Sequence, residues 1–154
     1  MAEDLFGKNL MKTSIRHFGI SVKNLNSMQK FFVNDLGFKV LRKMYESGVF
    51  IEKILNLKNV KVTTVKLRDE NNNIIELLKF HNYKTKYKNW RGKVYTIGPT
   101  HIALNTKDID LFFSKNKKKL KFNSPPEISP DGKAKVTFCN GPENLVIEIV
   151  EMIN

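Results

Sequence analysis

Two stretches decide how this chain folds: HFGISVKNLN at residues 17–26 and HIALNTKDID at residues 101–110. Each begins with a histidine in an apolar run and carries a lysine at the sixth position after it. Each then continues with Asn or Asp, an aliphatic residue, and Asn or Asp again. A pair of phenylalanines follows, at 31–32 in the first copy and at 112–113 in the second. Self-similarity of this kind indicates a duplicated module.

Both copies also end alike. The first closes with NIIELL at 73–78 and the second with LVIEIV at 145–150, so one glutamate interrupts each apolar run. The interval from the histidine to this glutamate is longer in the first copy, which therefore carries the longer insertion.

Residue periodicity predicts the same order of elements, β-α-β-β-β, in each copy. In the first copy Asn24 or Asn26 is expected to cap the helix and Gly37 to end it. The segment 47–57 reads as a short helix or a structured loop. The first copy has expected strands at 14–22, 38–45, 60–68 and 73–80 and a helix at 27–35. The second has strands at 98–105, 133–139 and 144–151, a helix at 108–119 and an extended piece at 122–129.

The domain organisation follows from this pattern. We expect an α+β protein with an N-terminal tail at 1–13, a first module at 14–80, a linker at 81–97 and a second module at 98–152. The linker is polar, aromatic and lysine-rich.

Four polar residues recur at matching places in the two copies, and strand alternation suggests what they do. Glu76 shares a strand face with Leu78, while Ile75 and Leu77 point to the other side. An ionised carboxylate in such a run is costly unless it is paired, hydrogen-bonded or bound to a metal. A single His or Glu in a strand is usually structural, so the prediction rests on all four in register. They form a candidate pseudo-twofold metal site: His17, Glu76, His101 and Glu148.

The ligand types narrow the cofactor. Two imidazoles and two carboxylates suit one divalent ion among Ni, Co, Mn, Fe and Zn. His81 has no counterpart in the second copy, and we expect it to be an ordinary surface residue.

Charge and cysteine content limit the classes of protein to which this chain can belong. The net charge is +12, with lysine far more common than arginine and a dense lysine patch at 115–121. Nucleic-acid binding is one interpretation of this charge, but arginine is scarce and no nucleic-acid motif is present, which favours solvated lysine-rich faces. The expected partner is a small-molecule substrate, and the positive charge would suit an anionic one. Cys139 is the only cysteine, so no internal disulfide forms. Without a signal sequence or a membrane-spanning run, we expect a cytoplasmic protein with no nucleic-acid or membrane partner.

Six stretches follow a known pattern: RHFGI at 16–20, LGF at 36–38, IELL at 75–78, PTHIA at 99–103, the stretch 124–132, and ENLVIE at 143–148. In their order and spacing they resemble the vicinal oxygen chelate superfamily, which includes glyoxalase I, epimerases, extradiol dioxygenases and bleomycin resistance proteins. The resemblance covers about residues 14–152. It differs at 140–144, where this chain has NGPEN and many relatives have a DPDGN turn; no ligand is lost by that change.

The resemblance implies a curled, cup-like mixed sheet with flanking helices, and a ligand set closest to glyoxalase I and related epimerases. It implies a metal-dependent lyase or isomerase that abstracts a proton next to a metal-bound carbonyl through an enediolate. Glu148 is the implied base and Glu76 serves the opposite face. A homodimer is expected, because members often complete or shield sites by pairing modules. A metal-dependent dioxygenase and a metal-free, resistance-type binding protein of the same fold stay open, and no glutathione-binding motif is identified.

Overall fold

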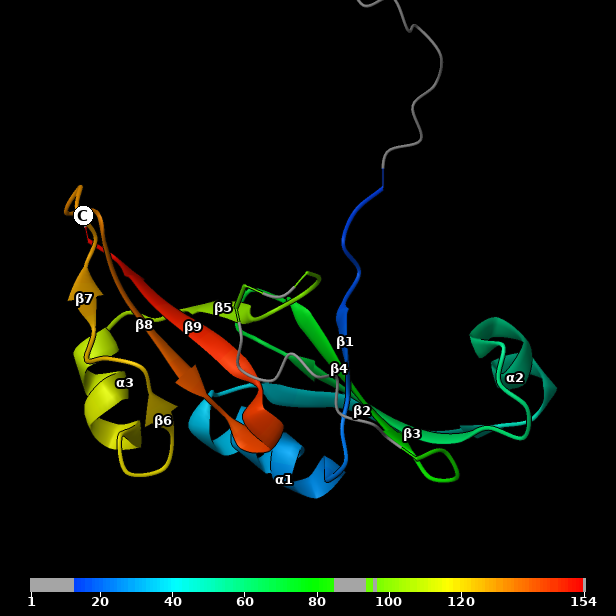
Figure 1. The fold of residues 1–154 in the computed structure, drawn as a ribbon. Helices are drawn as coiled ribbons and strands as arrows, with labels where there is room; N and C mark the ends of the chain where they lie inside the picture. Colours follow the sequence, from blue (N-terminus) through cyan, green and yellow to red (C-terminus); the bar gives the residue numbers. More distant parts are fainter. Residues whose placement is uncertain (1–12, 85–93, 96, 154) are drawn as a thin grey trace, which may run out of the picture.

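A computed structural model of the chain describes residues 13–84, 94–95 and 97–153 (Figure 1). The expected tail at 1–13 and linker at 81–97 therefore fall largely outside the described residues. The first module contains β1 (Phe18–Ser21), α1 (Leu25–Lys30), a π-helical turn (Phe31–Asp35), β2 (Lys39–Ser47), α2 (Val49–Leu55), β3 (Lys61–Arg68) and β4 (Ile74–Phe80). The second contains β5 (Ile102–Asn105), α3 (Ile109–Asn116), β6 (Lys121–Phe122), β7 (Glu127–Ile128), β8 (Ala134–Asn140), a 3-10 turn (Pro142–Asn144) and β9 (Val146–Met152).

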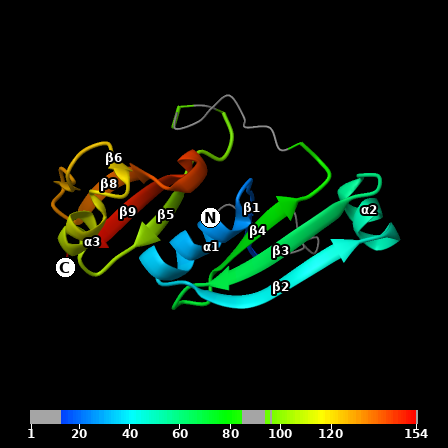
Figure 2. The same cartoon turned by 90° about the horizontal axis from the view of Figure 1, so that it is seen from below.

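The strands divide over two open sheets, one in each module, that lie side by side with α1 beneath the space between them (Figures 1 and 2). The first sheet has the order β1-β4-β3-β2, and the second has the order β5-β9-β8-β6 with β7 also paired to β8. β1 runs parallel to β4 in the first sheet, and β5 runs parallel to β9 in the second. The other strand pairs are antiparallel. The α+β class and the paired modules are thus confirmed.

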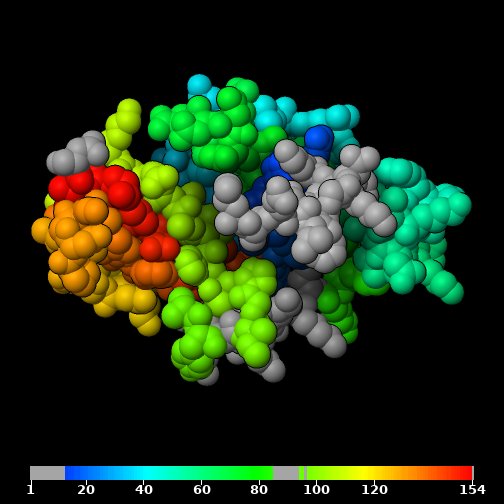
Figure 3. Space-filling view, turned by 90° about the horizontal axis from the view of Figure 1, so that it is seen from above, coloured from blue at the N-terminus to red at the C-terminus, as the bar shows by residue number. Residues whose placement is uncertain are grey.

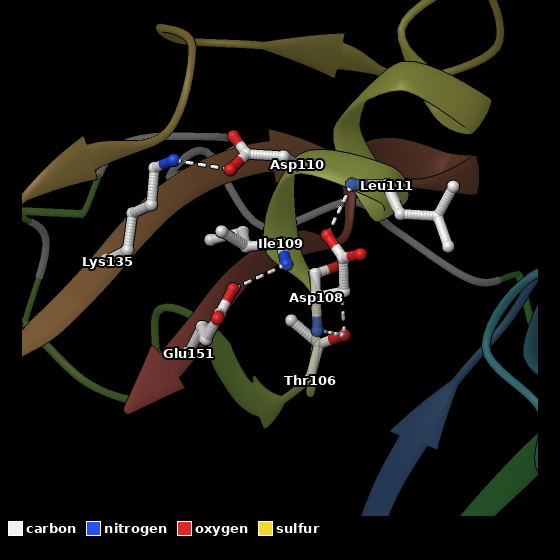
Figure 4. Close-up of polar contacts among 7 residues, drawn as sticks. All are labelled: Thr106, Asp108, Ile109, Asp110, Leu111, Lys135 and Glu151. Carbon is white, nitrogen blue, oxygen red and sulfur yellow. Dashed lines mark hydrogen bonds and ion pairs between the residues drawn. The ribbon is translucent and has the colours of Figure 1, made fainter. Parts of the chain in front are cut away.

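The helices that follow β1 and β5 are capped in the same way. The Asn24 side chain accepts a hydrogen bond from the Ser27 N–H at 3.0 Å, and Asp108 accepts one from the Leu111 N–H at 2.8 Å. Each cap satisfies a backbone donor that has no partner within its helix, and is worth about 1 kcal/mol. Figure 4 shows the second cap, beside which Glu151 of β9 accepts from the first N–H of α3.

The helix expected over 27–35 changes its hydrogen bonding halfway. After α1, the Leu36 N–H reaches back five residues to the Phe31 carbonyl at 3.2 Å, which defines the π-helical turn. Phe31 and Phe32 are both buried there, and their rings pack edge to face. Gly37, at φ +75°, then reverses the chain into β2, which confirms its expected role as the stop.

One hydrophobic core joins the two modules. Side chains on the inner faces of β4 and β9 meet Met28, Phe31 and Phe32 from the helical segment. Because successive strand residues alternate between faces, burying this set turns the residues between them outward. The inner-face residues are Val65, Leu67, Ile75, Leu77, Cys139, Ile147 and Ile149. The shared core thus covers the inner face of each sheet and not the outer face.

The ambiguous segment 47–57 forms the helix α2. Its Ile51 packs on Val60 and Val62, and this small cluster extends to Leu78 and Phe80 on the outer face of β4. The other side of the helix exposes Val49, Phe50 and Ile54. In the described part of the chain, no helix is long and apolar enough to cross a membrane.

Candidate metal centre

The first histidine and glutamate meet on the outer face of the first sheet. Gly19 is the register partner of Glu76 in the parallel β1–β4 pair. His17 lies two residues before Gly19 and so takes the same face as Glu76. The distance from His17 Nε2 to Glu76 Oε2 is 3.1 Å, and the Glu76 side chain is only 14% exposed.

The second module repeats this geometry. Ala103 is the register partner of Glu148 in the parallel β5–β9 pair, and His101 lies two residues before it. The distance from His101 Nε2 to Glu148 Oε2 is 3.2 Å. The other ring nitrogen, Nδ1, lies 2.9 Å from the Thr100 hydroxyl, which orients the imidazole. Two His–Glu pairs of the same construction therefore occur in one chain.

The two pairs do not come together within one chain. Among the described residues, no group of three or more His, Cys, Asp or Glu side chains is placed to hold a metal ion. All four predicted residues are thus found in pairs, one pair on each sheet. In each sheet the neighbours of the glutamate in sequence point to the core, so the pair points away from it.

The side of the molecule opposite α1 is viewed in Figure 3, where the second module lies on the left and the first on the right and top. Both modules contribute to this surface, and residues of the β1 region are seen between them.

The residue opposite the glutamate differs between the modules. Across β3–β4, Lys66 is the register partner of Glu76, and its Nζ lies 3.6 Å from Glu76 Oε1. Across β8–β9, the corresponding residue is Phe138, whose ring lies 5.3 Å from the His101 ring. Neither Lys66 nor Phe138 was predicted as a site residue from the sequence. The alternation of 60–68 does put Lys66 on one side of its strand, but the strand register is needed to place it beside Glu76.

A separate hollow of about 640 Å³ lies on the other face of the first sheet, beside the start of α1. It does not include either His–Glu pair. His81 lines it, exposed as expected, with its Nε2 2.8 Å from the Thr63 hydroxyl. The lining residues are Lys23, Asn24, Leu25, Asn26, Lys43, Thr63, Lys79, His81 and Glu143.

The chemistry of the pairs fits a divalent ion. Each pair offers one imidazole Nε2 and one carboxylate, both from side chains more than half buried. Two such pairs supply nitrogen and oxygen donors of the kind that first-row transition ions take. The lone thiol does not contribute, because Cys139 lies in the core, where burial raises its pKa to about 11.

Comparison with known proteins gives a consistent result. The family model described as "Glyoxalase/Bleomycin resistance protein/Dioxygenase superfamily" matches residues 14–149. A search of curated proteins finds no match. Among solved structures, a glyoxalase family protein from Bacillus cereus superposes with a TM-score of 0.82 at 18% identity, over 98% of this chain and 100% of that one.

Two named enzymes are also similar in fold. The trypanothione-dependent glyoxalase I of Leishmania major has a TM-score of 0.61 at 24% identity, over 91% of this chain and 87% of that one. Glyoxalase I from Zea mays has a TM-score of 0.61 at 21% identity, over 90% of this chain and 44% of that one.

Proposed function

This chain belongs to the glyoxalase/bleomycin resistance protein/dioxygenase superfamily, and from that membership and its two His–Glu pairs we propose that it is a metal-dependent lyase or isomerase of the glyoxalase I or epimerase type. The observation that carries the proposal is the repetition of one His–Glu pair at the same strand register in both modules. Sheet packing alone gives no reason to put an imidazole beside a half-buried carboxylate twice.

The four side chains of His17, Glu76, His101 and Glu148 would together hold one ion of Ni, Co, Mn, Fe or Zn. When bound, such an ion supplies Lewis-acid polarisation of a carbonyl oxygen.

The proton transfer falls to a carboxylate of this chain. A base must lie within hydrogen-bond reach of the carbon that loses its proton, and a glutamate of the centre meets that condition. Glu76 contacts both His17 and Lys66, whereas His101 is the one polar partner of Glu148 in the described part of the chain. Glu148 is thus the freer of the two, so we assign it the role of taking the proton and returning it to the product. Glu76 then stays as a ligand and faces the other side of the substrate.

We further propose that the site is completed in a homodimer. The pairs of one chain lie apart, and both point away from the core that joins the modules. The His17–Glu76 face of one copy can then meet the His101–Glu148 face of the other. A twofold symmetric dimer of this kind would contain two equivalent four-residue sites.

A metal-free binding protein of the same fold is the second candidate. It is favoured by the fact that each glutamate already has a histidine partner within hydrogen-bond distance and needs no ion to satisfy it. The two candidates differ in metal content.

The deciding experiment is elemental analysis of protein purified without chelator, for the wild type and for His101→Ala. We expect about one transition-metal ion per chain in the wild type and loss of it in the variant. The loaded protein is then incubated in D2O with the methylglyoxal–glutathione hemithioacetal and with epimerisable acyl or sugar compounds, and NMR follows exchange of the proton next to the carbonyl. Absence of metal after addition of each of the five ions would reject the enzyme and leave the binding protein.

A further inference from the structure

The two walls of the proposed site are chemically unequal. The two modules repeat the histidine and the glutamate, but the side chains around each glutamate belong to different classes. The difference is largest in the row of residues that runs across the sheet through each glutamate.

In the first module this row is cationic. Arg42 of β2 is the register partner of Lys66 of β3, which is the partner of Glu76 of β4, so all three share one face. The neighbouring row on the same face pairs Lys39 with Arg68. We call the outer-face residues Lys39, Arg42, Lys66 and Arg68 the cationic wall.

A register shift in β2 keeps this wall on one face. Lys39 and Val40 pair with Arg68 and Leu67, but Arg42, rather than Leu41, pairs with Lys66. The extra residue is a β-bulge. Without it, Leu41 would lie opposite Lys66, and Arg42 would point to the other side of the strand.

An ordinary ion pair does not account for the whole wall. One carboxylate opposite one lysine is a common cross-strand pair, and Lys66 with Glu76 is such a pair. Arg42 and Arg68, however, make no ion pair among the described residues, and both are exposed. The other carboxylate of this face, Glu46, lies two rows away and accepts a hydrogen bond from Thr64. The wall thus has spare positive charge next to Glu76.

The side chains directly around Glu148 are apolar, and Lys121 joins this face only in the next row, opposite Asn140, which is itself opposite Val146. Glu148 is flanked along β9 by Val146 and Val150, and across the sheet by Phe138. Val136 continues the same face of β8. A compound held directly between the two glutamates therefore meets Lys66 and Arg42 on one side, and Phe138 with Val146 and Val150 on the other.

We propose, on the basis of the proposed function, that the cationic wall selects the substrate. Lys66 and Arg42, with Arg68 beside them, bind a carboxylate or phosphate group of a compound whose carbonyl lies at the His–Glu centre. Adjacent strands are about 4.8 Å apart and alternate residues about 6.8 Å apart, so the wall begins one strand away from Glu76. The anionic group therefore sits a few bonds from the reacting carbonyl. Arginine suits this task because its planar guanidinium binds both oxygens of such a group.

The test uses two matched pairs of small hydroxy acids, each of which offers vicinal oxygens to a metal. Malate is compared with 2-hydroxybutyrate, and 3-phosphoglycerate with glycerate, so the first pair tests an added carboxylate and the second an added phosphate. Dissociation constants are measured by calorimetry on the metal-loaded protein. We expect at least one compound with the added anion to bind about tenfold more tightly than its partner, and the pair that shows the larger ratio identifies the anionic group.

Substitutions then locate the effect. Arg42→Gln and Lys66→Met should bring the ratio close to one, whereas Lys66→Arg should retain it. Lys43→Gln is the matched control, because Lys43 is the next residue of the same strand and its side chain lies on the opposite face. Arg42 is exposed, so its variant keeps the assay informative if Lys66→Met fails to fold.

Two results would contradict the proposed role of the cationic wall. One is equal dissociation constants within both pairs for the metal-loaded wild type; the other is an equal loss of preference in Lys43→Gln and Arg42→Gln. Failure of the proposed function is seen separately, as absence of bound metal. In that case 3-phosphoglycerate and glycerate are titrated into the metal-free protein. Equal dissociation constants for the two compounds, or a preference that Arg42→Gln retains, would reject the proposed role of the cationic wall as well.

Discussion

The carboxylate of Glu143 accepts hydrogen bonds from the backbone N–H of Lys23 at 2.8 and 3.0 Å, and so ties the turn before β9 to the start of α1. The same carboxylate accepts from the Asn24 N–H at 2.6 Å. These bonds join segments 120 residues apart and link the second module to the first outside their shared core. Glu143 makes them from a left-handed backbone conformation, at φ 56°.

Glu143→Ala should lower the free energy of unfolding by about 1–2 kcal/mol, because bonds to a charged acceptor are lost while the strained backbone remains. Glu143→Gly should cost less, since glycine adopts positive φ freely. Glu70→Ala is the control, because Glu70 lies exposed in a turn and its side chain makes no hydrogen bond or ion pair with another described residue. Urea unfolding measures all three; equal stability of the Ala and Glu70 variants would contradict the role of Glu143.

The Cys139 thiol should be inert in the folded protein, because it is fully buried and burial raises its pKa from 9.0 to about 11. A thiol reagent at pH 8 should label one site per chain in urea and almost none in its absence. Since the folded state holds its proton more tightly, this group contributes stability below about pH 9, and loses it as pH rises toward 11. Comparison with Cys139→Ala isolates that part of the alkaline loss. Rapid labelling without urea would show that the core opens.

The repeated motifs predicted much of the fold. A histidine followed by a strand and a capped helix, and a strand interrupted by one glutamate, occur twice; alternation then puts His17 and Glu76 on one face once the β1–β4 register is known. The same argument holds for His101 and Glu148. The repeat therefore predicted the four residues as one candidate site, whereas their grouping into two pairs depends on the strand registers.

Other features depend on information that periodicity does not contain. The pairing of Lys66 with Glu76 needs the β3–β4 register, and the position of Arg42 needs a bulge at Leu41. Glu143 acts across 120 residues and leaves no local pattern. The separation of the two pairs follows from how the modules pack on α1, which is a tertiary property. The helix α2 was ambiguous because a short apolar run suits both a helix and a loop.

If Glu148 takes the proton, Glu148→Gln should reduce proton exchange next to the carbonyl by about 10²–10⁴-fold and leave the fold unchanged. Glutamine has nearly the same shape but cannot accept the proton. Glu76→Gln serves as the comparison, because the two glutamates occupy equivalent positions and differ in their contact with Lys66. We expect the Glu76 variant to retain more exchange per bound metal. NMR in D2O measures the rates, and circular dichroism checks the fold; wild-type exchange in Glu148→Gln would remove it as the base.

If the centre is shared between two copies, variants that each lack one histidine should complement one another. In a mixed dimer of His17→Ala and His101→Ala, one site has both histidines replaced, and the other combines the intact His17–Glu76 pair with the intact His101–Glu148 pair. Random pairing should then restore about a quarter of the wild-type metal content, whereas each variant alone restores none. The two proteins are mixed in mild denaturant, refolded together and measured by elemental analysis. The double variant His17→Ala/His101→Ala mixed with His101→Ala is the control, because no mixed dimer of those chains has an intact site. A site made within one chain predicts no recovery in either mixture, so recovery in the first mixture alone can arise only from ligands that two copies supply together.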